Sequence, residues 1–470
     1  MTLLGRLGLD AKKPRSLQTQ LSGQLKELIQ RGELLSGERL PSTREMANDL
    51  RVSRNTVVAA YEMLVGQGYL EAHLRSGFCV CSAAQAFRTL PVNVAPTERK
   101  LTPARPRNPV PFRPTQPDVN LFPLQIWNRH RNKALKRGSC LLHYQSRFPI
   151  GLDELRQNVA VYLRDSRGVR CQWHEVAITS GSQQALYLLA HLLLEPGQRV
   201  YMEDPGYAGA RNAWKQAGAT VIPIPVDDEG MRLPEGKALP PALIYVTPSH
   251  QFPLGTCMSL GRRLSLLQAA REAGAWIIED DYDAEFRYTS SPQPSLQSLD
   301  KHRRVIYIGS FSKTLFPALR LAYAVLPPAL LEKFTALKSI MDDYGPLIDQ
   351  STLSSFIESG AFYAHLRRCR RHYAERQSFF LEQVSHFGLP LNFPITGRGL
   401  NLAGNLPQSS NDRVWSQRLR SAGLDIPPLS AYAMQPTQSG LLFGLAAFEK
   451  GAIQRGVAKM AEVFAGNHGR

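Results

Sequence analysis

The chain has 470 residues, of which 43% are hydrophobic and 20% are charged, and its formal net charge is +17. This length exceeds one ordinary domain, so we expect two or three domains, and the lack of any uncharged apolar run of about 18 residues excludes a membrane span. The N-terminus lacks the long apolar core of a signal peptide, and six scattered cysteines are typical of reduced thiols, so we expect a cytoplasmic protein without a bound metal.

The excess positive charge is concentrated between residues 82 and 151. That stretch holds 12 Lys/Arg and 2 Asp/Glu, whereas residues 1–81 hold 11 and 8, and residues 152–470 hold 33 and 29. Such a stretch attracts polyanions over about one Debye length. A solvated basic surface is the alternative explanation.

Residues 14–81 show dense helical periodicity. Apolar residues at helical spacing predict a first helix from Leu17 that ends near Gly32. Ser42 can cap a second helix, with Glu45 three residues later completing a capping box. A third helix follows after a short turn.

The third helix is capped by Ser53 and opens with Arg54, Asn55 and Thr56, and two short strands around Gly77 follow it. This order of elements predicts a winged helix-turn-helix. Recognition helices contact bases with their first turn, where arginine suits guanine and asparagine suits adenine. The backbone N–H groups at a helix start also attract phosphate.

The stretch GERLPSTREMANDLRVSRNTVVAAYEMLVGQGYL resembles the DNA-binding domain of the GntR family, and the match covers residues 16 to 80. The resemblance implies double-stranded DNA as a partner. Ser53 would contact phosphate, and Gly77, at the tip of the wing, would approach the minor groove. The complete set of residues that the resemblance places against DNA is Arg44, Ser53, Arg54, Asn55, Thr56 and Gly77.

Residues 82–115 are rich in proline and basic residues and show no sustained apolar period, which predicts a partly extended, semi-rigid linker. From residue 116 to 470, short β-branched runs such as VAITS, TVIPIPV and RVIYIGS alternate with helical patterns. This alternation predicts an α/β domain whose mostly parallel sheet is covered by helices on both faces.

Two stretches with candidate cofactor contacts follow strands early in this large domain. In ITSGSQQALYLLAHLLLEPG a strand ends directly before a helix, so Ser182, Gln183 and the N–H groups of the helix start can hold a phosphate. In EDPGYAGA, Tyr207 follows the next strand, where its ring can stack on a flat cofactor. A tyrosine packed in the core is the alternative for that residue.

An acidic cluster follows the buried run Trp276–Ile278, at the strand end where open α/β sheets bind ligands. Asp280 and Tyr282 are two residues apart and face the same side if the strand continues. A carboxylate can pair with a pyridine nitrogen, and a tyrosine hydroxyl can bond a phenolic oxygen. The alternative is a metal site built from the four acids between residues 279 and 283, which strand alternation would split across two faces.

The stretch SFSKTLFPALR follows the apolar run VIYIG. Lys313, directly after a strand, can condense with an aldehyde. Ser310, Ser312 and Arg320 can hold a phosphate beside it. A surface lysine is the usual alternative for such a short motif.

Together with VTPSHQFPLG and YIGSFSKTLFP, these stretches resemble fold-type I domains that bind pyridoxal 5′-phosphate, and more closely the MocR group of the GntR family, over residues 16–450. The resemblance implies a smaller C-terminal α+β part and an internal aldimine on Lys313. It pairs Asp280 with the pyridinium nitrogen, Tyr282 with O3′ and Tyr207 with the ring face. It also implies a homodimer in which each winged domain crosses to the partner's large domain. The residues it assigns to the phosphate are Ser182, Gln183, Ser310, Ser312 and Arg320.

Two positions depart from true transaminases. Where those enzymes have an Asn-Pro-Thr-Gly turn, this chain has Phe252–Gly255, which leaves His250 or Gln251 to bond the cofactor's O3′. Leu442 stands where a C-terminal arginine clamps the substrate carboxylate, and Arg398 is the alternative clamp.

These features predict a transcription regulator that senses pyridoxal 5′-phosphate, an amine or an amino acid through an aldimine at Lys313, without physiological turnover. One alternative is an active aminotransferase with an accessory DNA-binding module. Another is a cofactor-binding scaffold with neither activity.

Overall fold

The chain divides into two compact units, Met1–Ala104 and Arg105–Arg470. No helix in the described part of the chain is both long enough and apolar enough to cross a membrane. The structure is a computed structural model, and the residues that it describes are 6–11, 14–73, 77–83, 110–136, 139–143, 147–234, 239–289, 293–436 and 438–466.

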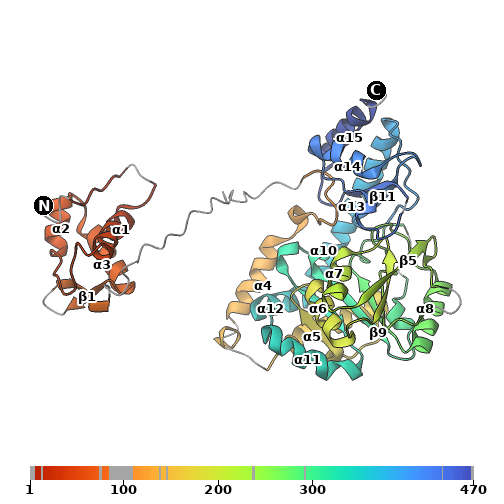
Figure 1. Cartoon of the computed structure of the whole chain (residues 1–470), viewed down its shortest axis with the longest axis horizontal. Coiled ribbons are helices and arrows are strands. Elements are labelled where there is room, and N and C mark those ends of the chain that lie inside the picture. The colour runs from red at the N-terminus through yellow and green to blue at the C-terminus, as the bar shows by residue number, and fades with distance from the viewer. Residues whose placement is uncertain are drawn as a thin grey trace. The chain divides into compact units, whose positions relative to one another are not determined.

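The described residues of the first unit form three α-helices and a two-stranded hairpin (Figure 1). Both halves of the predicted capping box are present, since Ser42 Oγ accepts from the Glu45 amide and Glu45 Oε2 accepts from the Ser42 amide. Ser53 Oγ accepts from the Thr56 amide at 3.1 Å. The elements are α1 (Leu17–Gln30), α2 (Thr43–Leu50), α3 (Arg54–Gly66), β1 (Leu70–His73) and β2 (Gly77–Val80).

The core of this unit lies between the three helices. Leu21 and Leu25 of α1 and Val57 and Tyr61 of α3 are fully buried in one cluster, as the helical spacing predicts. Val58, next to Val57, is only half-buried. The turn of the wing, residues 74–76, lies outside the described residues.

The second unit is built on an eight-stranded sheet with the order β3-β10-β9-β8-β7-β4-β5-β6. β5, β4, β7, β8 and β9 pair in parallel, and β10 and β6 pair antiparallel with their neighbours. The strands are β3 (Val176–Thr179), β4 (Arg199–Asp204), β5 (Thr220–Asp227), β6 (Gly230–Met231), β7 (Leu243–Val246), β8 (Trp276–Asp281), β9 (Val305–Ser310) and β10 (Ala322–Val325).

Helices cover both faces of this sheet, which confirms the predicted layers (Figure 1). Ile278 packs with Trp214 of α7 on one face, and its neighbour Ile277 packs with Leu266 of α8 on the other. The covering helices are α6 (Ser182–Leu193), α7 (Ala208–Gln216) and α11 (Pro328–Asp342) on the first face, and α5 (Asp153–Arg167), α8 (Leu260–Ala273) and α12 (Leu347–Glu358) on the second.

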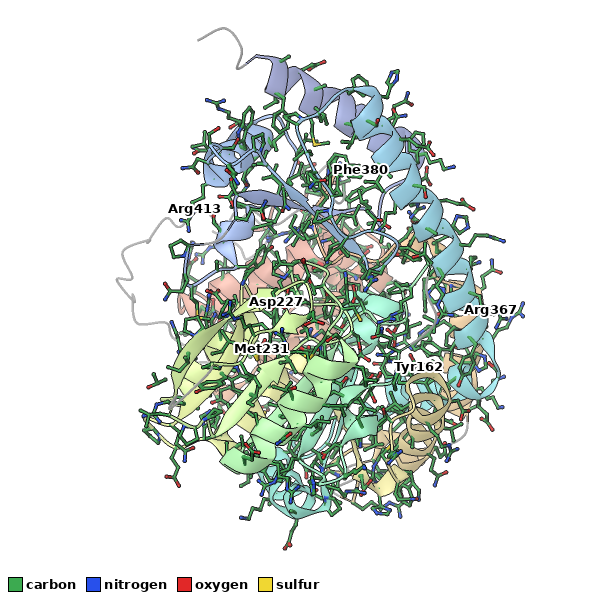
Figure 2. All side chains as sticks on the ribbon, turned by 90° about the vertical axis from the view of Figure 1, so that its right-hand side faces the viewer. Tyr162, Asp227, Met231, Arg367, Phe380 and Arg413 are labelled. Atoms are coloured by element: carbon green, nitrogen blue, oxygen red, sulfur yellow. The ribbon has the colours of Figure 1, made fainter. Side chains whose placement is uncertain are left out.

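A smaller α+β part follows, as the family resemblance implies. Phe380 of its long helix points inward and Arg367 points away (Figure 2), and the Phe380 ring lies 5.3 Å from Phe443. Its elements are α13 (Ala361–His386), β11 (Asn401–Asn405), α14 (Asp412–Ser421), β12 (Gly440–Gly444) and α15 (Lys450–Ala465). The remaining helices of the second unit are α4 (Leu124–Lys136), α9 (Leu296–Leu299) and α10 (Phe311–Thr314), with 3-10 turns η3 (Val119–Leu121), η4 (Ser139–Leu142), η5 (Trp173–Glu175), η6 (Pro317–Leu319) and η7 (Leu429–Ala431).

Residues 110–115 differ from the prediction, which places them at the end of the linker. Phe112 is fully buried between Phe380 and Phe443, because its ring fills the core of the α+β part. The Gly444 amide donates to the Phe112 carbonyl at 2.9 Å. These residues therefore belong to the second unit. Residues 84–109 of the predicted linker lie outside the described residues.

A buried ion pair links α5 to the end of β8. Arg167 Nε donates to Asp281 Oδ2 at 2.7 Å, and Arg167 Nη2 donates to Ser249 Oγ at 2.7 Å. Arg167→Met leaves a buried carboxylate without its counter-charge, so we expect it to destabilise the protein by about 3–5 kcal/mol in urea denaturation. Arg164→Met, on the exposed side of the same helix, is the control and should cost less than about 1 kcal/mol. Equal costs for the two variants would contradict this role of the ion pair.

Candidate functional site

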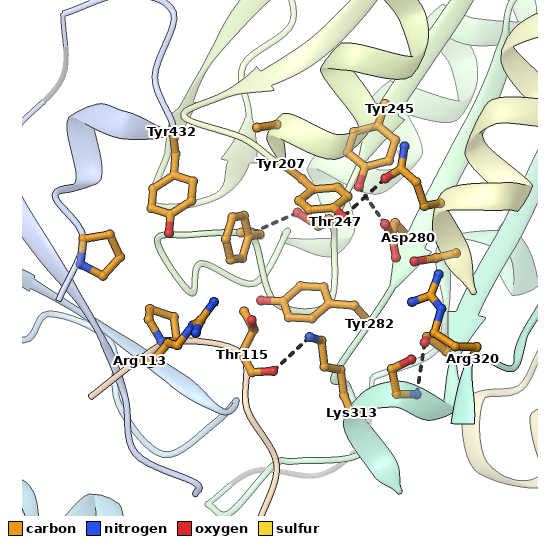
Figure 3. A pocket seen from close by; sticks show the side chains of 18 of the residues that line it. Arg113, Thr115, Tyr207, Tyr245, Thr247, Asp280, Tyr282, Lys313, Arg320 and Tyr432 are labelled. Atoms are coloured by element: carbon orange, nitrogen blue, oxygen red, sulfur yellow. Dashed lines mark hydrogen bonds between the residues drawn. The ribbon is translucent and has the colours of Figure 1, made fainter. Parts of the chain in front are cut away.

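A cavity of about 490 Å³ opens where the parallel strands end (Figure 3). This volume falls in the range of about 300–1,000 Å³ typical of small-molecule sites. All nine residues predicted as cofactor contacts line it, although they come from elements spread over 139 positions of sequence (182 to 320). They are Ser182, Gln183, Tyr207, Asp280, Tyr282, Ser310, Ser312, Lys313 and Arg320.

Lys313 lies in α10, the short helix that directly follows β9. Its Nζ donates to the Thr115 carbonyl at 2.9 Å. Burial lowers the pKa of the Lys313 ammonium, because the charged form loses hydration. A larger share of neutral amine follows, and the neutral amine is the form that attacks carbonyl groups.

Asp280 lies near the end of β8 and faces into the cavity (Figure 3). The Tyr245 hydroxyl, from neighbouring β7, donates to Asp280 Oδ2 at 2.7 Å. Burial raises the pKa of Asp280 to about 6, because the carboxylate has left water. A cation placed beside this carboxylate would stabilise its charged form.

Tyr207 and Tyr282, the two tyrosines predicted as cofactor contacts, line the cavity from different loops. The Tyr207 hydroxyl contacts Gln183 Oε1 at 3.4 Å. The Tyr282 hydroxyl lies 3.1 Å from His250 Nδ1, and the same nitrogen lies 2.9 Å from Asp283 Oδ1. Burial raises the pKa of both phenols, so both stay protonated at neutral pH.

The predicted phosphate contacts come from the start of α6, from the start of α10 and from the residue after η6. Gly181 caps that helix with φ +92°, and a Cβ at this position would stand 2.5 Å from Arg320 Nη2. Arg320 Nη2 donates to the Ser180 carbonyl at 3.0 Å. Ser310 Oγ accepts from the Ser312 amide at 3.1 Å. A helix start, hydroxyls and a guanidinium therefore line one end of the cavity, which is a donor set that fits a phosphate.

The metal alternative for the acids of residues 279–283 gains no support from their contacts. Glu279 accepts from the Leu296 and Gln297 amides, each at 2.8 Å. Asp281 pairs with Arg167 and Asp283 contacts His250. These acids turn toward separate protein partners rather than toward one common point.

The residues considered as replacements for the two missing transaminase groups lie outside the lining of the cavity. Gln251 Nε2 donates to the Pro205 carbonyl at 2.8 Å, and neither Gln251 nor His250 is among the residues that line the cavity; Phe252 is. Arg398 is not among them either. It forms an isolated β-bridge with Arg287. Leu442 is fully buried beside Phe252.

Several lining residues were not predicted. Tyr245 lies near the end of β7 and Thr247 directly follows that strand. They are two residues apart, as Asp280 and Tyr282 are, so the rule that ligands bind at strand ends could have found them. Tyr432 and Asp425 come from loops of the α+β part, and Arg113 comes from the predicted linker. No sequence motif marks these last three.

The predicted DNA contacts lie at the starts of α2 and α3. Arg44, Arg54 and Asn55 are exposed, and Arg54 Nε donates to Thr43 Oγ1 at 3.3 Å. Ser53 and Thr56 share a hydroxyl contact of 2.8 Å within the helix cap. Gly77 opens β2 with φ +88° and is exposed.

The wing also carries a group of possible metal ligands. The ligand atoms of Glu71, His73 and Cys79 lie within 4.8 Å of one another on paired strands. Glu71 and His73 are exposed.

Comparisons with known proteins cover both units. Residues 17–80 match the family described as bacterial regulatory proteins of the gntR family, and residues 127–436 match aminotransferase class I and II. The α-aminoadipate aminotransferase LysN of Thermus thermophilus, solved with N-(5′-phosphopyridoxyl)-L-leucine, shows a TM-score of 0.69 and 29% identity over 76% of this chain and 92% of its own. Fold and cavity thus define a fold-type I aminotransferase-like domain, joined to a GntR-type helix-turn-helix.

Full-length relatives place the chain more closely. It is 37% identical to the probable rhizopine catabolism regulatory protein MocR of Rhizobium meliloti, over 97% of this chain and 96% of that protein. It is 30% identical to the pyridoxine biosynthesis transcriptional regulator PdxR of Corynebacterium glutamicum, over 97% of this chain and 98% of that protein. The chain belongs to the MocR-type transcription regulators of the GntR family.

Proposed function

We propose that this chain is a DNA-binding transcription regulator whose large domain binds pyridoxal 5′-phosphate at Lys313 and responds to a primary amine. One observation carries the proposal: nine residues predicted as cofactor contacts line a single cavity. The cofactor would supply a reactive aldehyde carbon on an electron-withdrawing ring. That chemistry suits a sensor of amines, because an amine can react with the aldehyde reversibly.

Each part of the cavity would hold one part of the cofactor. The carboxylate of Asp280, oriented by Tyr245, would face the pyridine nitrogen. The Tyr282 hydroxyl would donate to the phenolic oxygen, and the Tyr207 ring would cover the ring face. The phosphate would be held by Ser182, Gln183, Ser310, Ser312 and Arg320.

The winged unit would bind double-stranded DNA with the first turn of α3. Arg54 and Asn55 are the proposed base contacts, and Arg44, Ser53 and Thr56 support them from the two helix starts. We further propose a homodimer, since two winged units would read two half-sites of one operator. Sedimentation of the full chain measures that oligomeric state.

The experiment that tests the proposed function measures coupling between the cavity and DNA. Selection from a randomised duplex library supplies a DNA fragment, and its affinity is then measured with and without pyridoxal 5′-phosphate and a panel of amines. We expect a change of about 5- to 150-fold in wild type and no change in Lys313→Ala. An affinity that is the same in every state would contradict the proposal. Rapid amino transfer to a keto acid would instead favour the aminotransferase alternative.

The pKa of Asp280 gives a prediction for the cofactor-free protein. Because its folded pKa of about 6 lies above the unfolded value of 3.8, the native chain holds an extra proton between these values. Stability should therefore fall as the pH rises through this window, by roughly 3 kcal/mol from this group. Asp280→Asn removes the titration, so thermal unfolding of wild type and variant across the window isolates the effect. Identical pH profiles for the two proteins would contradict it.

A further inference from the structure

Three cationic side chains line the cavity, and Lys313 stands between the other two. Arg320 lies beside the start of α6, and Arg113 lies on the opposite side of Lys313 (Figure 3). The proposed phosphate contacts occupy the Arg320 side. Arg113 is not among the residues proposed to hold the cofactor, and its charged partner in the structure is Asp425.

The backbone around Arg113 is fixed in an uncommon conformation. Phe112 and Thr115 have φ values of +66° and +63°, a region that residues other than glycine seldom adopt. The Asp425 amide donates to the Pro111 carbonyl at 3.0 Å, and the Thr115 amide donates to Asn401 Oδ1 at 2.6 Å. Such backbone strain persists where the surroundings enforce it and is concentrated at ligand sites. The backbone of Arg113 is therefore fixed at the cavity by its neighbours.

The Arg113 guanidinium is available to a ligand. Its Nε lies 3.7 Å from Asp425 Oδ2, which is longer than a hydrogen bond, and its side chain is 58% exposed. Asp425 also lies 3.5 Å from Arg420 Nη2, so this carboxylate keeps a counter-charge if Arg113 turns to another anion. Phe252 and Tyr432 line the same cavity and pack at 5.1 Å.

We infer that Arg113 binds the carboxylate of an amino-acid effector whose amino group is directed to the Lys313 region. This inference rests on the proposed function and adds the chemical class of the effector. Leu442 is buried and apolar, so the C-terminal strand offers no carboxylate partner at that position. Arg113 reaches the cavity from the first described segment of the second unit and supplies the planar, bidentate donor that a carboxylate fits.

The test titrates the full chain, loaded with pyridoxal 5′-phosphate, with amino acids and with alkylamines of the same carbon chain length. Visible absorbance reports binding, and affinity for the selected DNA fragment is a second readout. In Arg113→Gln we expect affinity for the amino acids to fall about 10- to 100-fold, since a charge-assisted hydrogen bond is lost. Affinity for the alkylamines and the loading with cofactor should stay unchanged. Arg113→Lys should restore only part of the loss, because lysine lacks the bidentate geometry.

Arg367→Gln is the control, since Arg367 is an exposed arginine of α13 that is not among the residues that line the cavity. It should bind amino acids as wild type does. Equal losses for amino acids and alkylamines in Arg113→Gln, or no loss for either, would overturn the role of Arg113 while cofactor binding still stands. A wild-type protein that never acquires visible absorbance would instead contradict the proposed function itself.

Discussion

Lys313→Ala is expected to abolish covalent retention of pyridoxal 5′-phosphate. Among the residues that line the cavity in the described part of the chain, Lys313 is the one with a primary amine. Burial lowers its pKa, which favours the neutral, reactive form. Without it, borohydride treatment should leave no adduct on the protein, and the visible absorbance band of the loaded wild type should disappear.

Two further variants show whether the loss of the adduct comes from the missing amine, from the missing charge or from the loss of any lysine. Lys313→Arg keeps a cation at this place but cannot condense with an aldehyde, so it should also lose the adduct. Lys215→Ala removes an exposed lysine from α7 and should retain the adduct at position 313. Mass spectrometry of peptides locates the trapped group. An adduct that persists in Lys313→Ala at wild-type yield would refute the assignment of the cofactor to this residue.

Combined replacement of Arg54 and Asn55 by alanine should remove sequence-specific DNA binding. Both side chains are exposed in the first turn of α3, where recognition helices meet base edges. Each good base contact contributes about 1–3 kcal/mol. If the two losses add, binding weakens by about 2–6 kcal/mol, which corresponds to a loss of about 30-fold or more.

The measurement is a gel-shift titration with the selected duplex and with a scrambled duplex. Affinity for the scrambled duplex should change little beyond the loss of one positive charge. Arg31→Ala, an exposed arginine at the end of α1, removes the same charge elsewhere in the unit and serves as the control. If the double variant still prefers the selected duplex as strongly as wild type, the recognition helix has been placed incorrectly.

Local signals predicted much of the fold. Ser42 with Glu45, and Ser53 with Thr56, form the expected caps because capping depends on residues close in sequence. Lys313 follows β9, the strand that the β-branched run RVIYIGS predicts. The antiparallel strand β10, inserted between β3 and β9, was not predicted, because strand order is set by pairing across long sequence separations.

The parts of the cavity that escaped prediction depend on tertiary packing. Pro111, Arg113 and Pro114 resemble the preceding proline-rich stretch in composition. The burial of Phe112 and backbone hydrogen bonds to Asp425 and Gly444 tie them to the second unit. Tyr432 and Asp425 reach the cavity from loops that carry no periodic pattern. Composition indicates whether a segment has regular structure, but it does not indicate which distant core will accept a single aromatic ring.

The tetrapeptide Phe112–Thr115 has two structural roles that lie only three residues apart. Its first residue anchors the large unit's N-terminal edge, and its last residue offers the carbonyl that faces the lysine amine. Insertions or deletions before residue 110 would change the length of chain between the two units. They would not change the spacing between Phe112 and Thr115. Removal of a single residue within the tetrapeptide would displace either the phenyl ring or the carbonyl. The number of residues between the two units can thus differ among related regulators, whereas the length of the Phe112–Thr115 segment is constrained by the cavity that it lines.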